Sequence, residues 1–400
     1  MRLPTVFLSA LEPSADLHAA NLIAAIRARE PETRFLGVGG PKMREAGCET
    51  LFDLTTRSAM LLGAVGLVAE AFRMLCRIDR LFGAGVADVF VPVDSPTFNL
   101  PVSLRAKARG LPVVYFIAPQ VWAWAEFRIH KVRKRTDRLA VILPFEEPYF
   151  RSHGINATFV GHPLIESLAR TPIDTMAVSA FNDLGEPLVT CMPGSRGHVV
   201  DEVLPGQIEV CQAIVRRHPN AAFVFAAASR AIAQRIARTL DRAAQTQRLR
   251  CQIVTGRNAE AISAADLVLV ASGTATLEVA YHNRPMIVMY NASKWGYRLI
   301  GRRLIRTEHL SLVNILARRR IVPEFMPYYD STAPITQVAL EILANPSRQA
   351  AMRDDLADLI QELGSHDVAQ EAAAIVLDVL RAQPCPTRHP ALRGSRHRVW

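Results

Sequence analysis

The sequence is poor in clustered cysteines, long hydrophobic runs and aromatic residues, and each shortage excludes a class of protein. Six cysteines are scattered without a Cys-x-x-Cys pair or a Cys/His cluster, which argues against a disulfide framework or a structural zinc. The longest apolar stretch, at 59–69, is shorter than the roughly 18 residues that a membrane-spanning helix needs. Glu12 and Asp16 interrupt the N-terminal apolar run before a signal peptide could form. We therefore expect a reduced, cytoplasmic protein.

Acidic residues are also in short supply relative to basic ones. The chain has 47 Lys+Arg against 37 Asp+Glu, a formal net charge of +10, which favours an anionic partner such as a nucleotide or an acidic membrane surface. Basic segments at 128–138 and 297–306 fit the membrane surface. No basic segment is interleaved with aromatics in the way that single-strand binding requires, so we expect no nucleic-acid partner.

What the sequence does have is a repeated alternation of short apolar runs and helical patterns, which is typical of parallel sheets built from βαβ units. We expect strands at 4–10, 33–40, 87–94, 111–119, 138–145, 187–194, 221–228, 251–256, 265–273 and 285–290. The fold class is therefore α/β, with two Rossmann-like domains facing a cleft, where such folds bind ligands.

The alternation restarts after a polar, proline-containing stretch at 170–187, which sets the domain organisation. We predict one Rossmann-like domain over 1–175 and a second over 176–365. A helix at 366–383 is expected to pack back on the first domain. Residues 384–400, rich in proline and arginine, are expected to form a basic flexible tail.

The stretch CMPGSRGHVV at 191–200 places a glycine, a hydroxyl and an arginine where a strand should stop and a helix start. Gly194 lets the backbone approach a ligand, Ser195 can donate a hydrogen bond, and Arg196 can direct two donors at a phosphate. The free N–H groups of a helix start attract anions. Taken alone, the same three residues are also compatible with an ordinary turn.

A second strand–helix junction, VASGTATLEVA at 270–280, has the same character. Ser272, Gly273 and Thr274 suit a phosphate, and Glu278 could accept hydrogen bonds from ribose hydroxyls. The alternative is a capped helix in which Glu278 only complements the dipole. Two strand–helix junctions suited to binding an anion, both in one half of the chain, favour a nucleotide diphosphate as the ligand.

Asp94 ends a very apolar strand, so we expect its carboxylate at the cleft, where it could act as a general base. The alternative is a turn before Pro96. Glu12, Ser14 and Asp16 in the N-terminal loop are also candidates for substrate contact, although Ser14 or Asp16 could instead be a helix N-cap.

The segment 57–83 has the pattern of a basic amphipathic helix, which can lie in a membrane interface. A surface helix packed on its own core is the alternative. The candidate membrane contacts from its apolar and basic faces are Val68, Phe72, Leu75, Arg73 and Arg77.

Several segments together resemble the signature segments of one known family, the lipid-A-disaccharide synthases of glycosyltransferase family 19. They are IAPQVWAW (117–124), LPFEEPYF (143–150), FVGHPL (159–164), PGSRG (193–197), ASGTATLE (271–278) and SLVNILA (311–317). The resemblance implies the two-Rossmann glycosyltransferase B-type fold. It also implies a UDP-sugar-dependent, inverting transfer without a cofactor or a metal.

The resemblance implies as substrates UDP-2,3-diacylglucosamine and 2,3-diacylglucosamine 1-phosphate (lipid X), with the lipid A disaccharide 1-phosphate and UDP as products. Asp94 is the implied base, and Glu12 is implied in the N-terminal loop. Arg196 would lie near the UDP diphosphate, and Asn314 in the nucleotide pocket. The implied location is cytoplasmic, peripherally on the anionic inner membrane. The resemblance leaves open whether the protein forms a homodimer.

The sequence departs from the family pattern at the expected cleft. Leu11 and Ala15 replace two glycines of the N-terminal loop, and Val199 stands where a glutamate is usual. Val313 replaces a proline, and Pro327 stands in the place of a glutamine. These changes keep three alternatives open: a paralogue acting on another UDP-sugar or lipid acceptor, a UDP-sugar epimerase on the same fold, and a non-catalytic nucleotide- or membrane-binding relative.

Overall fold

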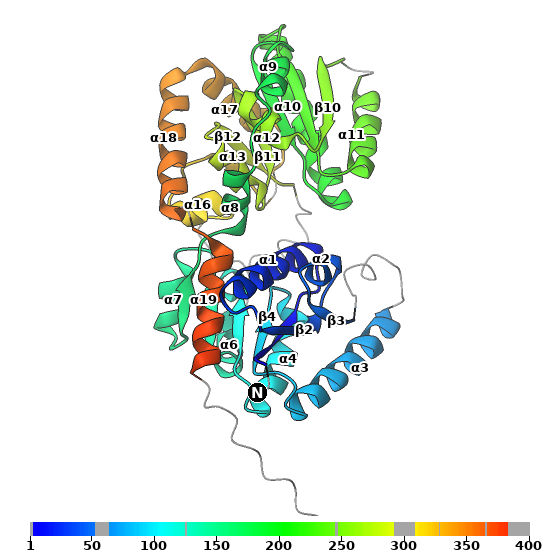
Figure 1. The fold of residues 1–400 in the computed structure, drawn as a ribbon. Coiled ribbons are helices and arrows are strands. Elements are labelled where there is room, and N and C mark those ends of the chain that lie inside the picture. Colours follow the sequence, from blue (N-terminus) through cyan, green and yellow to red (C-terminus); the bar gives the residue numbers. More distant parts are fainter. Residues whose placement is uncertain are drawn as a thin grey trace, which may run out of the picture.

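Two lobes, each built around a parallel sheet, make up the chain (Figure 1). The computed structural model describes residues 3–52, 64–124, 126–244, 247–291, 309–327, 329–364 and 366–382. The α/β class with parallel sheets that the sequence predicts is confirmed.

The sheet of the first lobe has the strand order β3-β2-β1-β4, and three further strands follow in the order β5-β6-β7. Parallel bridges between Phe90 and Val113 and between Val93 and Phe116 place β5 beside β4. The strands are β1 (Thr5–Ser9), β2 (Arg34–Val38), β3 (Glu49–Phe52), β4 (Val89–Pro92), β5 (Val114–Phe116), β6 (Arg138–Val141) and β7 (Ala157–Phe159).

The sheet of the second lobe has the order β10-β9-β8-β11-β12-β13, which repeats the arrangement of the first. Every residue of β8, β11 and β12 is buried, as expected for parallel strands covered by helices on both faces. The strands are β8 (Leu188–Met192), β9 (Ala222–Ala227), β10 (Cys251–Thr255), β11 (Leu267–Ala271), β12 (Met286–Met289) and β13 (Glu324–Phe325).

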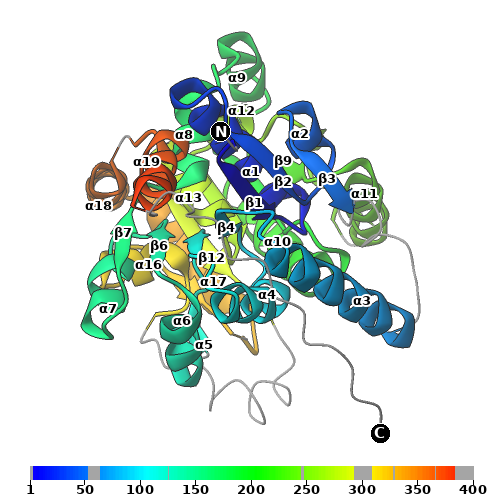
Figure 2. The ribbon, with the colours of Figure 1, turned by 60° about the horizontal axis from the view of Figure 1, so that its bottom comes forward.

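Helices connect the strands of the first lobe and cover both faces of its sheet (Figures 1 and 2). They are α1 (Pro13–Arg29), α2 (Pro41–Glu45), α3 (Ala64–Gly83), α4 (Pro96–Ala108), α5 (Val121–Trp124), the 3-10 turn η1 (Glu126–Arg128), α6 (Ile129–Arg135) and α7 (Glu146–Ser152). The next two helices, α8 (Pro163–Arg170) and α9 (Thr175–Asn182), pack against α13 and α12 of the second lobe. Proline opens α1, α2, α4 and α8, a position where its missing N–H costs no helical hydrogen bond.

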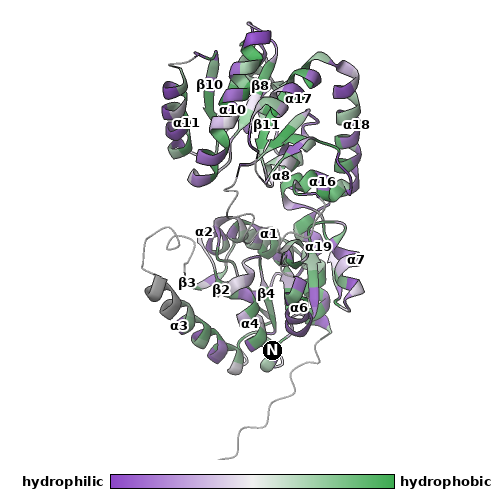
Figure 3. Ribbon diagram, turned by 180° about the vertical axis from the view of Figure 1, so that it is seen from behind, coloured by the Kyte–Doolittle hydropathy of each residue, from purple (hydrophilic) through white to green (hydrophobic). Residues whose placement is uncertain are grey.

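The second lobe has its own helices, and the strands at its centre are more apolar than the helix at its edge. In Figure 3, β8 and β11 are green, whereas α11 at the periphery is largely purple. The helices are α10 (Gly197–Arg217), α11 (Arg230–Ala243), α12 (Asn258–Ala264), α13 (Ala275–Tyr281), α16 (Leu312–Ala317), α17 (Ala333–Ala344) and α18 (Pro346–Leu363).

The last helix, α19 (Val368–Arg381), follows α18 of the second lobe in the chain and packs against α1 of the first lobe (Figure 1). Its buried residues, among them Ala373 and Val376, share an apolar cluster with α1 and with strands β1 and β4. The segment that leads into α19 lies beside the one that leads into α8. There, Gly161 has a φ of 87°, and a side chain at that position would meet the Cβ of His366 at 2.3 Å. The domain boundaries inferred from sequence stay predictions.

Candidate functional site

A cleft of about 1620 Å³ lies between the two lobes. Its walls come largely from segments that directly follow strands, because all strands of a parallel sheet end on the same edge. The first lobe contributes the exposed face of α1 and the segments after β4, β5, β6 and β7. The second contributes the segments after β8, β11, β12 and β13, together with α16.

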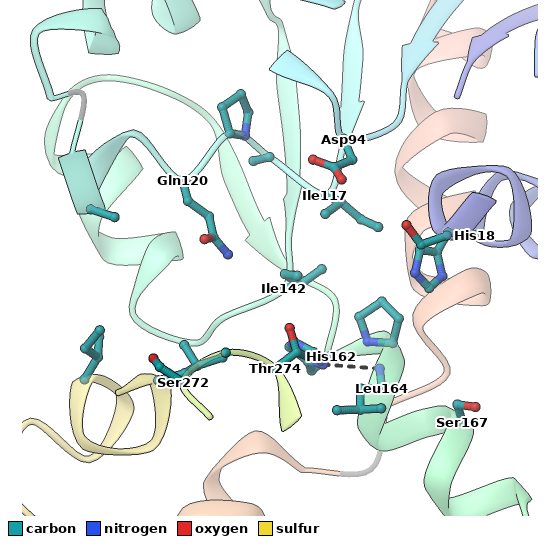
Figure 4. A pocket seen from close by; sticks show the side chains of 18 of the residues that line it. His18, Asp94, Ile117, Gln120, Ile142, His162, Leu164, Ser167, Ser272 and Thr274 are labelled. Carbon is teal, nitrogen blue, oxygen red and sulfur yellow. Dashed lines mark hydrogen bonds between the residues drawn. The ribbon is translucent and has the colours of Figure 1, made fainter. Parts of the chain in front are cut away.

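Six of the twelve residues that the sequence singled out for catalysis or substrate binding line this cleft. They are Ser14 and Asp94 from the first lobe and Arg196, Ser272, Gly273 and Thr274 from the second. Three segments that are distant in the sequence, the end of β4 and the starts of α10 and α13, therefore meet across one space. Figure 4 shows Asp94 on one side of this space and Ser272 and Thr274 on the other.

Arg196 stands at the start of α10, whose 21 residues give a long run of aligned peptide dipoles. The side chain lies exposed at the cleft. Gly194, two residues earlier, has a φ of 113°, and a side chain added there would meet Val199 Cγ1 at 2.8 Å. A glycine is thus required for the chain to turn from β8 into α10. This junction can hold an anion through Arg196 and the helix start together.

Asp94 lies in an unusual backbone conformation at the end of β4. Asp94 and Ser95 have φ angles of 52° and 48°, in the left-handed region that non-glycine residues rarely occupy. Ile117, at the end of the adjacent β5, has a φ of 57° and also lines the cleft. Each such residue costs on the order of 1–3 kcal/mol, and residues of this kind cluster at functional sites.

Two histidines that the sequence analysis did not select also line the cleft, with His18 on the side of Asp94 and His162 beside Leu164 (Figure 4). Burial lowers the pKa of His18, and the charge of Asp94 acts in the opposite direction. Burial also lowers the pKa of His162 to about 4, with a further contribution from His18. His162 Nδ1 accepts the Leu164 N–H at 3.2 Å, so the neutral ring carries its proton on Nε2. Both rings are therefore uncharged at neutral pH.

Trp122 lines the cleft and is held by a buried carboxyl group. Its Nε1 donates to Glu146 Oε1 at 2.9 Å, while Glu146 Oε2 accepts the N–H groups of Ile142 and Leu143 at 3.2 and 3.1 Å. Glu146 is completely buried, and this burial raises its pKa to about 7, against the effect of its hydrogen bonds. Glu146 thereby fixes two parts of the cleft wall, Trp122 and Ile142.

The raised pKa of Glu146 predicts that stability falls as the pH rises. The folded-state value of about 7 lies above the unfolded value of 4.5, so the folded protein favours the protonated group. Its contribution is full below about pH 4.5 and is lost as the pH rises through 7. Between pH 5 and pH 8, the free energy of unfolding should fall by about 2 to 3 kcal/mol through this group. Urea unfolding at the two pH values measures the change.

Glu146→Gln should remove most of that pH dependence, because the amide does not titrate. Glu147→Gln is the matched control, since Glu147 is the next residue but is partly exposed and paired with Arg151 at 2.8 Å. Equal slopes for Glu146→Gln and the unchanged protein would contradict the assignment.

Two of the candidate residues do not line the cleft, and their side chains form hydrogen bonds within the fold. Asp16 is buried, and its carboxylate accepts the N–H groups of Gly40, Lys42 and Met43 at 2.8 to 3.1 Å, so it fixes the start of α2. Asn314 is also buried. Its Oδ1 accepts the N–H groups of Ile321 and Val322, and its Nδ2 donates to Glu324 at 3.0 Å. The Asn314 amide thus has all its donors and acceptors in use, and Asp16 has three of its roughly four acceptor sites in use.

Four further candidates lie next to the cleft without lining it. Glu12 is exposed at the N-cap of α1, and Gly194 and Ser195 precede Arg196. Glu278 is in the first turn of α13, where burial raises its pKa. Any contact of these residues with a ligand stays a prediction.

The departures from the family pattern are accommodated locally. Ala15 lies inside α1 and Pro13 opens it, so the loss of glycine causes no positive φ at Leu11 or Ala15. Asp201, the acidic residue nearest in sequence to Val199, forms an ion pair with Arg235. Burial and the nearby Glu202 carboxylate raise the pKa of Tyr290, which lines the cleft.

The cleft also holds side chains to which the sequence analysis gave no role. Among them are His18, Gln120, Trp122, His162 and Tyr290. Gln120, Trp122 and His162 belong to two of the quoted family segments, and this was the available signal. Nothing local marked His18 or Tyr290. Within the described ranges, no three His, Cys, Asp or Glu side chains are placed to hold a metal ion.

The helix predicted to touch a membrane, α3, is divided between an inner and an outer face. Ile78 and Phe82 are buried against the sheet, and Leu75 is partly buried on the same cluster, so its contact with a membrane stays a prediction. Phe72 is 62% exposed, and Arg73 and Arg77 are exposed as well. The side chain of Val68 lies outside the described residues. No described helix is both long and apolar enough to cross a bilayer.

Solved structures share this arrangement of two lobes around a cleft. A putative UDP-N-acetylglucosamine 2-epimerase from Listeria monocytogenes has a TM-score of 0.58 at 14% identity, covering 95% of this chain and 96% of its own. The glycotransferase of kitacinnamycin also has a TM-score of 0.58, at 15% identity, covering 95% and 100%. At these identities the likeness concerns the fold alone, and it confirms the predicted glycosyltransferase B-type architecture.

Sequence comparison gives the family. A family model described as lipid-A-disaccharide synthetase matches residues 6–379. The lipid-A-disaccharide synthase of Syntrophus aciditrophicus is 34% identical over 394 residues, 95% of this chain and 99% of the relative. The enzyme of Pseudomonas paraeruginosa is 34% identical over 380 residues, covering 94% and 98%. Because these matches run through both lobes and the cleft between them, the chain belongs to the lipid-A-disaccharide synthase family.

Proposed function

We propose that the cleft joins UDP-2,3-diacylglucosamine to 2,3-diacylglucosamine 1-phosphate and releases UDP and the lipid A disaccharide 1-phosphate. One observation carries this proposal: Asp94 and Arg196 come from different lobes and line the same space. Transfer of a sugar from UDP needs a base for the acceptor hydroxyl and a stabilised leaving group. The two side chains supply these at opposite walls.

The reaction is a single displacement. The acceptor hydroxyl oxygen attacks C1 of the donor sugar while Asp94 takes its proton. The bond between C1 and the diphosphate oxygen breaks, and its electron pair leaves with UDP. Arg196 and the start of α10 stabilise the charge that develops on the diphosphate. Attack from the side opposite the leaving group inverts the configuration at C1.

The uridine nucleotide would lie along the second lobe. Ser272, Gly273 and Thr274 form an exposed loop after β11, and Tyr290 follows β12. Gly273 has a φ of 137° and no atom within 4 Å of where a side chain would be, so backbone groups are open to a ligand there. Ser14 on α1 faces the acceptor side.

An assay of acceptor dependence tests the proposal against an epimerase and a non-catalytic relative. UDP release from UDP-2,3-diacylglucosamine should require lipid X, and UDP-N-acetylglucosamine should undergo no change at C2, as read by NMR. Epimerised UDP-N-acetylglucosamine would favour the epimerase. UDP binding without turnover of any acylated donor would favour the non-catalytic relative.

The acylated substrates are held in a bilayer, and a surface of the first lobe suits contact with it. Helices α3, α4 and α6 lie side by side (Figure 2). Together with η1 they present the exposed apolar side chains Phe72, Leu104 and Phe127, which are 46 to 63% accessible. A basic residue stands next to each of them. The surface can therefore insert apolar side chains into the bilayer and attract anionic lipid. The protein would thus be a peripheral protein of the cytoplasmic face.

If this surface contacts the membrane, removing its exposed apolar side chains should reduce binding to vesicles. A variant with Phe72→Ser and Phe127→Ser should sediment with vesicles containing anionic lipid about tenfold less well, because two apolar side chains no longer enter the interface. Met176→Ser is the matched control, since Met176 is 81% exposed but lies on α9 at the far end of the second lobe (Figure 1). Equal loss in the control would count against the surface.

A further inference from the structure

A buried network of hydrogen bonds lies directly behind Asp94. The carbonyl oxygen of Asp94 accepts two hydrogen bonds of 2.7 Å, one from Asn99 Nδ2 and one from the Tyr115 hydroxyl. On the other side of the residue, the Asp94 N–H donates to the Phe116 carbonyl at 3.1 Å. Both peptide groups that flank the Asp94 side chain are therefore fixed.

Side chains from β1, from β5 and from the helix that follows β4 make up this network. Tyr115 comes from β5, Asn99 from α4 just after β4, and Ser9 from the end of β1. Ser9 Oγ donates to Asn99 Oδ1 at 2.7 Å, which sets the orientation of the amide and points Asn99 Nδ2 at Asp94. All three side chains are completely buried. The Tyr115 hydroxyl thus donates to the backbone at the end of the adjacent strand β4.

The network acts on a residue whose backbone conformation is unfavourable by itself. Asp94 and Ser95 both have a positive φ, although neither is glycine. A left-handed conformation at two consecutive residues persists only where the surroundings impose it. Asp94 then faces the cleft between Ile117 and His18 (Figure 4).

We propose that Tyr115 and Asn99 are positioning residues for the reaction, holding the Asp94 backbone in the left-handed conformation that aims its carboxylate at the acceptor hydroxyl. They touch no substrate and act through Asp94. This inference rests on the proposed role of Asp94 as the base.

Tyr115→Phe tests the inference, because it removes one hydroxyl and keeps the buried ring. The expected result is a fall in kcat of about tenfold, as for loss of one well-formed hydrogen bond that sets geometry. KM for both substrates and Kd for UDP should change less than about twofold, because the nucleotide side of the cleft is untouched. Rates are divided by the concentration of UDP-binding sites measured by calorimetry, so unfolded protein does not count.

Ser9→Ala is the second variant. It tests the same inference independently if the Tyr115→Phe protein does not fold. It removes the donor that orients Asn99, so kcat per UDP site should fall several-fold, again without a change in KM. Tyr149→Phe is the matched control. Its hydroxyl is also buried, but no residue in the described part of the chain forms a hydrogen bond with it, and Tyr149 lies on α7 without lining the cleft. The control should keep the full rate.

The outcomes separate this inference from the proposed function. If Asp94→Asn stops transfer but Tyr115→Phe and Ser9→Ala keep the full kcat per UDP site, the positioning role is overturned and the function stands. If Asp94→Asn leaves transfer unchanged, the base assignment fails and the positioning role fails with it. A lower kcat with constant KM in both variants, and none in Tyr149→Phe, supports the role.

Discussion

Asp94→Asn is expected to lower the rate of glycosyl transfer by about 10²–10⁴-fold, because the amide cannot take the proton of the acceptor hydroxyl. At this position the substitution should change the chemistry of the side chain and leave the backbone conformation as it is. Asparagine tolerates the left-handed φ of 52° as well as aspartate does, so the backbone at the end of β4 should not move. Alanine would add strain at the same position and confuse the result.

Single-turnover rates with both acylated substrates measure this effect, and calorimetry with UDP measures binding. The Kd for UDP should stay within about twofold, since Asp94 and the proposed diphosphate site lie on opposite lobes. Asp241→Asn, on the exposed side of α11, is the control for loss of one carboxylate. Full transfer by the Asp94→Asn protein would remove Asp94 from the mechanism.

Arg196→Ala should weaken UDP binding by about 10- to 100-fold and lower kcat as well. A hydrogen bond between an arginine and a phosphate contributes on the order of 1.5–3 kcal/mol, and the diphosphate gains charge as the sugar leaves. The start of α10 remains, so some affinity for UDP should persist. Affinity for uridine, which has no phosphate, should be unchanged.

The uridine comparison makes this prediction specific to the phosphates. Arg238→Ala is the matched control, because Arg238 is an exposed arginine of the same lobe, on α11, and does not line the cleft. If UDP and uridine lose affinity equally in the Arg196→Ala protein, Arg196 does not bind the diphosphate.

Most of the fold could be predicted because its strands are buried on both faces. Continuous apolar runs mark such strands clearly, and the runs at 4–10, 187–194 and 265–273 became β1, β8 and β11. The strands that the sequence did not reveal are β3, β7 and β13, which have two to four residues each. They lie at sheet edges, where few side chains need burial and the apolar signal is correspondingly weak.

The candidate site could be predicted only in part, because sequence gives the ends of strands but not the directions of side chains. Asp94 and Arg196 follow apolar strands, and in parallel sheets this position alone brings them to the cleft. Asp16 and Asn314 look equally polar in the sequence. Their partners, the N–H groups of Gly40 and Ile321, come from other elements or a following loop and become visible only in the structure.

The hydrogen-bond network behind Asp94 could not be predicted from the sequence either. Tyr115 lies within an apolar run and reads as a core residue, yet its hydroxyl reaches the carbonyl of a neighbouring strand end. The local sequence VDSPTFN contains no glycine to signal the left-handed turn at Asp94 and Ser95. The conformation depends on contacts between three strands, which no short motif specifies.

The most direct test of the account is a product assay with the purified full chain in detergent. UDP-2,3-diacylglucosamine and lipid X are mixed with the protein, and the lipid products and UDP are quantified by thin-layer chromatography and mass spectrometry. We predict that one disaccharide 1-phosphate forms for each UDP released. UDP bound with no disaccharide formed would contradict the account and would direct attention to Val199 and to the loop around Glu12.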